Sequence, residues 1–168
     1  AAMFESHFRL LPARIASGHC SSQRTVGELE SDHDCVVDPD WLTYLAYKFV
    51  HSGFVAVGGP YLPPPEESRT AACVAASPGG PAHVLIDDEV AEHIPGCNMA
   101  FRRAALAEIG GFDPTYTKAG DDVDVCWRLQ ERGYRLGFSP AAFVWHYRRS
   151  TVRAYLKQQK GYGEAEAL

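Results

Sequence analysis

From Asp38 onward, helical and strand-like runs alternate along the sequence and end at glycines, and this alternation restricts the fold more than any other feature. Apolar residues recur at helical spacing from Trp41 to Phe49, and Gly53 ends that run. Residues 54–57 then form a short apolar run that is typical of a buried strand. Strands that alternate with helices indicate an α/β fold, in which helices cover a sheet.

The same reasoning locates the later elements. We expect a helix from about Arg102 to Ile109, a second from Asp121 to Arg132, and two short strand-like runs within residues 134–146. Thr151 can cap a last helix that continues to about Lys160.

Three further segments carry local signals. Asp38 can cap the first helix, Pro39 suits its first position, and Asp40 complements the helix dipole. A helical pattern covers residues 4–16. Residues 61–83 are rich in proline and glycine, which predicts a long irregular excursion over the surface.

Bulk properties exclude several classes of protein. The 168 residues suit one domain, and a net charge of -5 without a basic run argues against binding of nucleic acid. No apolar stretch approaches the roughly 20 residues of a membrane span, and the first residues lack a secretory signal, so we expect an internal start and a cytoplasmic protein. Reduced thiols are expected because the cysteines are scattered and odd in number: Cys20, Cys35, Cys73, Cys97 and Cys126.

The segment SDHDCVVDPDWL (residues 31–42) places four carboxylates within nine residues. In an extended segment Asp32 and Asp34 point the same way, because side chains alternate along a strand. Two hard anionic oxygens suit Mg²⁺ or Mn²⁺ that carries a phosphate-bearing ligand. The alternative is a polar turn before the helix, which we accept for Asp38 and Asp40.

A second acidic group, Asp121, Asp122 and Asp124, follows Gly120. Acids at a helix start are favoured by the dipole, and Asp124 can pair with Arg128 one turn on. A carboxylate at the mouth of a site could instead act as a general base. The local pattern leaves both interpretations open.

His146 ends an apolar run and is followed by two arginines. A histidine in such a place is usually structural, but beside Asp34 it would complete a ligand set that suits Mn²⁺. Arg148 and Arg149 could meet phosphate oxygens or could simply carry surface charge.

Together these segments resemble the glycosyltransferase family 2 domain, which has the GT-A fold. SDHDCVVDPDWL is similar to its metal-binding D-x-D and helix start, GCNMAFRRAALAEIGGFDP to its glycine-asparagine loop and Gly-Gly-Phe-Asp turn, and AGDDVDVCWRLQERGYRLGFSPAAFVWHYRRST to its acidic catalytic segment and histidine. Order and spacing match over roughly residues 27–163. The resemblance implies an α/β, GT-A-like layered domain with a mixed sheet flanked by helices.

For the donor side, the resemblance implies that Asp34 and His146 bind Mn²⁺ or Mg²⁺, with Asp32 beside the ribose or the metal. Gly96 and Asn98 would line the donor sugar pocket. The donor would be a nucleoside-diphosphate sugar.

For the acceptor side, the resemblance implies that Asp122 deprotonates an acceptor hydroxyl and that Asp121 orients the acceptor, whose identity stays open. The metal would offset charge on the leaving group while the carboxylate activates the nucleophile. Transfer would invert the anomeric centre in one displacement.

The chain also departs from the family pattern. Residues 1–30 show no counterpart of the strands that hold the nucleobase, so we expect a divergent or truncated segment there, an incomplete version of the fold, and a catalytic and acceptor-side region over residues 31–168. Polar Glu30 and Ser31 stand where the lead-in strand is usually apolar. The segment QQKGY matches the Gln-x-x-Arg-Trp signature of processive synthases only in part, because Gly161 stands in place of the arginine. This favours a non-processive enzyme.

Two other functions stay open. A non-catalytic remnant or binding module of the same fold would explain the missing nucleotide half. A metal-dependent nucleotidyl- or phosphotransferase would also use a D-x-D, although GGFDP and DDVDVCWRL argue against it.

Overall fold

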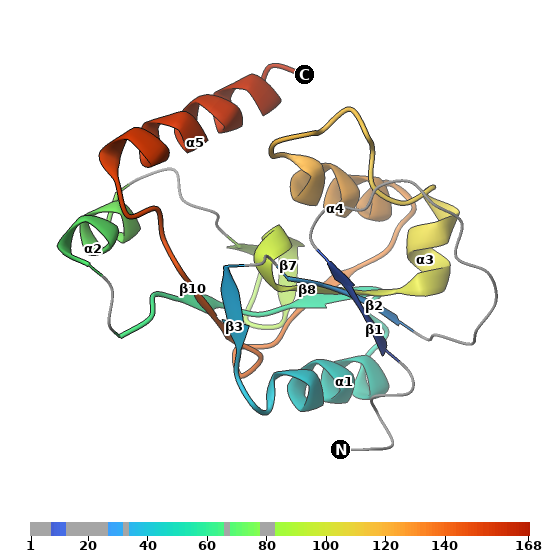
Figure 1. The fold of residues 1–168 in the computed structure, drawn as a ribbon. Helices are drawn as coiled ribbons and strands as arrows, with labels where there is room; N and C mark the ends of the chain where they lie inside the picture. The colour runs from blue at the N-terminus through green and yellow to red at the C-terminus, as the bar shows by residue number, and fades with distance from the viewer. Residues whose placement is uncertain (1–7, 13–26, 32–33, 66–67, 78–82) are drawn as a thin grey trace.

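The computed structural model describes residues 8–12, 27–31, 34–65, 68–77 and 83–168. Two sheets occur in this part of the chain, and helices lie around them (Figure 1). The larger sheet has the order β1 (Phe8–Pro12), β2 (Gly27–Ser31), β8 (Met99–Arg102), β4 (Ala56–Gly58), β9 (Leu136–Phe138), β7 (Val90–His93) and β6 (Val84–Leu85). The small sheet has the order β3 (Cys35–Val37), β10 (Val144–His146) and β5 (Tyr61–Leu62).

The larger sheet is mixed, as expected. Strand β1 runs parallel to β2, and β4 runs parallel to β9. Strand β8 is antiparallel to both β2 and β4, and β7 is antiparallel to both β9 and β6. The helices are α1 (Trp41–His51), α2 (Arg69–Ala75), the 3-10 turn η1 (Gly96–Asn98), α3 (Arg103–Glu108), α4 (Asp121–Glu131) and α5 (Val152–Ala165).

Helices cover both faces of the larger sheet. Because neighbouring residues of a strand point to opposite faces, Ala56 joins the apolar cluster of α3 and α4, whereas Val57 joins that of α1. In the same way Phe101 packs with α3 and α4, and Ala100 packs with α1. The expected α/β layered fold is confirmed.

The first helix buries the face that its sequence predicts. Trp41, Leu45 and Phe49 are all buried. The helix begins at Trp41, later than its cap signals indicated, because Asp38 closes a turn instead: its Oδ1 accepts a hydrogen bond of 3.0 Å from the N–H of Asp40. Asp40 itself occupies the N-cap position.

One core prediction is wrong. A large apolar side chain such as Trp127 is expected to pack beside this helix or beneath the sheet, yet it is 53% exposed. Helix α4 buries Val125, Cys126 and Leu129, and a residue two places after Val125 falls on the opposite side of a helix. The Trp127 indole N–H reaches Glu92 Oε1 at 3.4 Å.

Elsewhere the structure alters three boundaries. Within the helix expected over residues 4–16, residues 8–12 form strand β1, and the rest of that range lies outside the described residues. The irregular excursion over residues 61–83 contains β5 and α2. Thr151 caps α5 by accepting from the N–H of Ala154 at 3.2 Å, and the helix continues past Lys160 to Ala165.

Gly58, the last residue of β4, and Gly59, which follows it, allow two other segments to approach closely: the segment that leads into η1 and the loop before β10. A Cβ added at Gly58 would lie 1.9 Å from Ile94 Cγ2, and one at Gly59 would lie 2.0 Å from the carbonyl oxygen of Ala142. Any side chain at either position would push these segments apart. None of the described helices combines the length and apolar character needed to cross a bilayer.

Candidate functional site

The small sheet joins residues that are far apart in sequence. Strand β10 pairs antiparallel with β3, and this register places His146 directly opposite Cys35. The pairing continues one step further, because the N–H of Tyr147 donates to the carbonyl oxygen of Asp34 at 3.0 Å. Backbone hydrogen bonds therefore fix the D-x-D segment against the histidine segment.

Asp34 contacts two basic side chains at this point. Its Oδ1 lies 3.3 Å from His146 Nε2, and its Oδ2 lies 3.1 Å from Arg149 Nη1. The Asp34 side chain is only 16% exposed, and His146 is buried. Asp34 and His146 thus converge as the sequence predicted, while their role as metal ligands remains a prediction. Asp32 lies outside the described residues.

The turn η1 brings a second pair of predicted residues together. The N–H of Gly96 donates to Asp122 Oδ2 at 3.0 Å, and Asp122 Oδ1 accepts from the N–H of Val123, also at 3.0 Å. A Cβ added at Gly96 would lie 3.5 Å from the Asp122 Cβ, so the two residues pack directly. Backbone amides therefore hold both carboxylate oxygens of Asp122.

The acids of α4 begin immediately after Gly120, whose positive φ of 87° turns the chain into the helix. Asp121, Asp122 and Asp124 all lie in the first turn, where the helix dipole favours negative charge. Asp124 Oδ2 accepts from Arg128 Nε at 2.8 Å and from Arg128 Nη2 at 2.6 Å, which confirms the predicted pair.

The Asn98 side chain is fully buried: Oδ1 accepts from the Trp41 indole at 2.7 Å, and Nδ2 donates to the carbonyls of Pro60 at 3.0 Å and Ala142 at 2.8 Å. Both amide hydrogens are used, so this side chain anchors η1 to α1 and to the loop before β10. Its expected place in the donor sugar pocket stays a prediction.

Cysteines form the part of the site that sequence reasoning missed. Cys35, Cys97 and His146 each offer a ligand atom, and these atoms all lie within 4.8 Å of one another. Nothing in the cysteine spacing signals this cluster, because its members come from β3, η1 and β10. Cys126 is also buried, but burial raises the pKa of its thiol to about 12.

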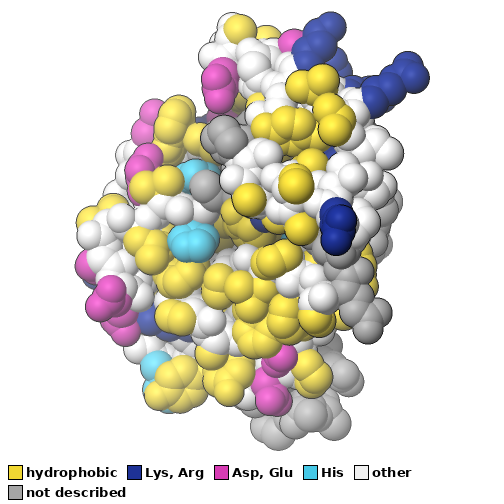
Figure 2. All heavy atoms as spheres, turned by 90° about the vertical axis from the view of Figure 1, so that its left-hand side faces the viewer, with side chains coloured by type: hydrophobic (Ala, Val, Ile, Leu, Met, Phe, Trp, Pro, Cys, Tyr) yellow, Lys and Arg dark blue, Asp and Glu magenta, His cyan; other side chains and the backbone are white. Residues whose placement is uncertain are grey.

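The surface near the small sheet is largely apolar. Figure 2 shows histidine side chains set among hydrophobic ones on the face that lies at the left in Figure 1. Exposed hydrophobic residues from the strands of this sheet and just beyond β10 include Val36, Leu62 and Tyr147. Arg148 lies over the ring of Tyr61, with its guanidinium carbon 4.5 Å from the ring centroid.

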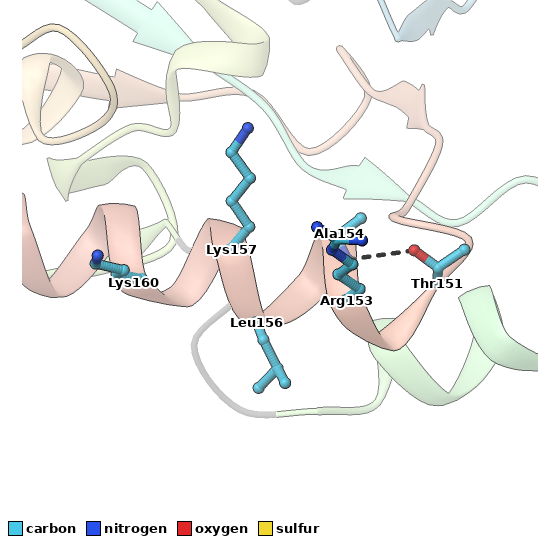
Figure 3. Close-up of a pocket in the computed structure, with 6 residues that line it drawn as sticks. All are labelled: Thr151, Arg153, Ala154, Leu156, Lys157 and Lys160. Atoms are coloured by element: carbon cyan, nitrogen blue, oxygen red, sulfur yellow. Dashed lines mark hydrogen bonds between the residues drawn. The ribbon is translucent and has the colours of Figure 1, made fainter.

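A separate hollow lies along α5 (Figure 3) and contains none of the predicted site residues. It is lined from Thr151 to Lys160, and three of its side chains are basic: Arg153, Lys157 and Lys160. Lys157 and Leu156 leave the helix in opposite directions in this view. A hollow built from one helix lacks the convergent groups of a catalytic site.

Residues 31–163 match the sequence model of the family described as Glycosyl transferase family group 2. The chain is 35% identical over 83 residues to the Pre-mycofactocin glycosyltransferase of Mycobacterium tuberculosis strain H37Rv, a match that covers 49% of this chain and 17% of that protein. It is 30% identical over 78 residues to the Rhamnosyltransferase WbbL of Escherichia coli K12, covering 46% and 30% respectively. The match thus spans less than a third of either relative.

The fold also resembles a solved structure, GalNAc-T7 with UDP, GalNAc and Mn²⁺. The TM-score is 0.53 at 15% sequence identity, and the match covers 85% of this chain and 35% of that one. At this identity the likeness shows the fold.

Proposed function

The chain belongs to glycosyl transferase family group 2, and from this premise we propose that it transfers a sugar from a nucleoside-diphosphate sugar to an acceptor hydroxyl in a metal-dependent reaction. One observation carries the proposal. The turn η1 links the two predicted halves of the site. Its first residue, Gly96, contacts Asp122, and its second, Cys97, lies beside His146, which in turn contacts Asp34. A donor-side pair and an acceptor-side acid therefore flank one short turn.

Asp34 and His146 would hold the metal, Mn²⁺ or Mg²⁺. A carboxylate and an imidazole already in contact form a donor set that suits Mn²⁺. When bound, such an ion offsets the charge that develops on a diphosphate leaving group. GalNAc-T7 was solved with Mn²⁺ and UDP, which agrees with this assignment.

Two arginines would support the diphosphate. Arg149 pairs with Asp34 at 3.1 Å, and its side chain is about two-fifths exposed, so solvent and a ligand can reach it. Arg148 lies over the ring of Tyr61, 4.5 Å from its centroid. Guanidinium groups donate pairs of hydrogen bonds to phosphate oxygens, so this corner suits an anionic ligand.

Asp122 would be the general base. It lies at the start of α4, where the dipole favours the charged form, and the Gly96 N–H fixes the direction of its carboxylate. An oriented carboxylate can accept the proton of an acceptor hydroxyl as it attacks. Asp121, the first residue of α4, would orient the acceptor. Attack opposite the leaving group would invert the anomeric centre in one displacement. The transfer would be non-processive.

The test separates binding from chemistry. Asp34→Asn should abolish Mn²⁺-dependent binding of a nucleoside diphosphate in a calorimetric titration. Asp122→Asn should leave that binding intact and lower the rate of sugar transfer by about 10²–10⁴-fold, the usual contribution of a general base. Asp40→Asn, the same change at an exposed acid of the D-x-D segment, should alter neither.

The donor nucleotide is found in the same titration by comparing uridine, guanosine and thymidine diphosphates. If Asp122→Asn weakens nucleotide binding as much as Asp34→Asn does, Asp122 belongs to the donor site and the assignment of the base is wrong. Loss of both readouts in Asp40→Asn would mean that the segment acts through its net charge.

A further inference from the structure

Two thiols beside His146 have no place in the transfer reaction. Ligand atoms of Cys35, Cys97 and His146 lie within 4.8 Å of one another, and in the described part of the chain no other group of three metal-binding side chains meets this condition. We propose that these three residues form a binding site for a thiophilic divalent cation, with zinc as the expected ion.

Backbone pairing pre-arranges the three ligands. Cys35 and His146 are directly opposite residues of antiparallel strands, so their side chains share one face of the small sheet. Cys97 is the middle residue of η1, and both of its neighbours are held in place. The Gly96 N–H donates to Asp122, and the Asn98 side chain bonds to Trp41 of α1 and to two carbonyls. Chance proximity of surface groups would lack such a frame.

The distances suit zinc after a small adjustment. Zinc–sulfur bonds of about 2.3 Å and zinc–nitrogen bonds of about 2.0–2.1 Å place tetrahedral ligand atoms about 3.5–3.8 Å apart. Atoms separated by at most 4.8 Å need to approach by about 1 Å, which a change in side-chain torsion can supply. The described residues provide three of the four positions, and a water molecule would take the fourth, as in catalytic zinc sites.

Charge also favours a bound cation. Cys97 and His146 are buried, and Cys35 is half-buried. Zinc with two thiolates and a neutral imidazole carries no net charge, so burial costs little once the ion is in place. Binding releases the two thiol protons to solvent. Sulfur ligands prefer zinc to Mg²⁺ or Mn²⁺, which keeps this site chemically distinct from the donor-side metal.

Asp34 would act as the outer partner of the zinc site. A metal-bound histidine usually donates its other ring N–H to a carboxylate, and here Asp34 Oδ1 lies 3.3 Å from Nε2. If Nε2 serves Asp34, Nδ1 is the nitrogen that remains for zinc. The proposed sugar transfer also uses His146, as a ligand of Mn²⁺, so zinc would compete with Mn²⁺. This competition rests on the proposed function, whereas the thiol site does not.

Cobalt is the probe for the thiol site, because thiolate–Co²⁺ bonds give a near-ultraviolet charge-transfer band and tetrahedral Co²⁺ absorbs strongly in the visible. The background variant carries Cys20→Ser and Cys73→Ser, which leaves the three remaining cysteines as the only thiols. After reduction and a thiol count, one Co²⁺ per chain should produce both bands, and Zn²⁺ should displace it.

Single variants then assign the bands. Cys35→Ala and Cys97→Ala should each lower the charge-transfer intensity from that of two thiolates to that of one or less, while Cys126→Ala, a buried thiol outside the cluster, should leave it unchanged. If Cys97→Ala fails to fold by circular dichroism, Cys35→Ala still decides, because Cys35 is half-buried. A reduced protein without a thiolate band, or a band of unchanged intensity in Cys35→Ala, overturns the proposal.

The competition is measured with Mn²⁺ and a nucleoside diphosphate. At zinc concentrations about ten times its Kd, the apparent Kd of Mn²⁺ should rise about tenfold, and Cys35→Ala should cancel the rise. A rise that persists in Cys35→Ala would mean that zinc acts at Asp34 and would overturn the competition. A chain that shows the cobalt band but never binds a nucleotide would overturn the proposed function and leave the thiol site standing.

Discussion

The two sides of η1 are built by different means. On one side, the acidic rim, defined as Gly96 with Asp121, Asp122 and Asp124, is held by local backbone amides and by the dipole of α4. On the other, the small sheet has strands of only two or three residues, and its chemical groups come from segments more than 100 residues apart. The acidic rim therefore depends on one helix and its contact with the Gly96 N–H, whereas the small sheet depends on the packing beneath it.

The largest effect should come from removing that packing. Trp41 is buried at the start of α1 in the same apolar cluster as Val144 of β10. Trp41→Ala should lower the free energy of unfolding by about 3–5 kcal/mol, the cost of a large core cavity. Urea denaturation measures it. The matched control is Trp127→Ala on the exposed face of α4, expected within about 0.5 kcal/mol of the wild type.

A smaller change isolates one hydrogen bond. Trp41→Phe keeps most of the apolar volume but removes the donor that Asn98 Oδ1 accepts in the buried interior. An unsatisfied buried acceptor costs about 1–3 kcal/mol, so Trp41→Phe should fall between the wild type and Trp41→Ala. Equal stability of the two Trp41 variants would show that the hydrogen bond, not volume, dominates.

On the acidic rim, Asp124→Asn should have a modest effect. It weakens the half-buried pair with Arg128, whose side chain also donates to the carbonyl of Ile109 at 2.9 Å. Partial exposure screens the charges, so we expect a loss of about 1 kcal/mol, which shrinks in high salt. Thermal unfolding at two salt concentrations measures this. A salt-independent loss would point to the hydrogen-bond geometry instead of charge.

The smallest effect is expected at the turn itself. Gly96→Ala keeps the N–H that donates to Asp122, and its Cβ would lie at an ordinary contact distance of 3.5 Å. Stability should change by less than about 0.5 kcal/mol. If the rate of sugar transfer nevertheless falls, the cause would be contact between the new methyl group and a ligand, because the fold is unaffected. Gly58→Ala, which would place its Cβ 1.9 Å from Ile94, is the contrasting crowded glycine.

Local sequence signals were sufficient for the three acids of α4, although not for their contact with Gly96. Helical spacing, Gly120 and the i,i+4 pair of Asp124 with Arg128 all describe interactions within a few residues, and the structure agrees with them. The apolar face of α1 was predictable for the same reason. Each of these features is fixed by periodicity and capping within one element.

Long-range pairing accounts for what the sequence could not show. Scattered cysteines gave no spacing signal, yet the register of β3 with β10 sets Cys35 opposite His146. The anchoring role of the buried Asn98 side chain, with its three hydrogen bonds to Trp41, Pro60 and Ala142, also had no local signal. The polar strand β2 forms despite Glu30 and Ser31, because its backbone pairs with β1 and β8 on both sides.

The three consecutive residues of η1 have a thermodynamic consequence. Gly96 contacts the acid, Cys97 adjoins the histidine, and Asn98 ties the turn to α1, so the backbone cannot shift toward one partner without shifting at the others. If a ligand that binds on one side displaces the turn, the affinity for a ligand on the other side changes. Linkage requires this effect to be reciprocal and equal in free energy. Cation and acceptor would then each report the presence of the other, a cooperativity set by a segment only three residues long.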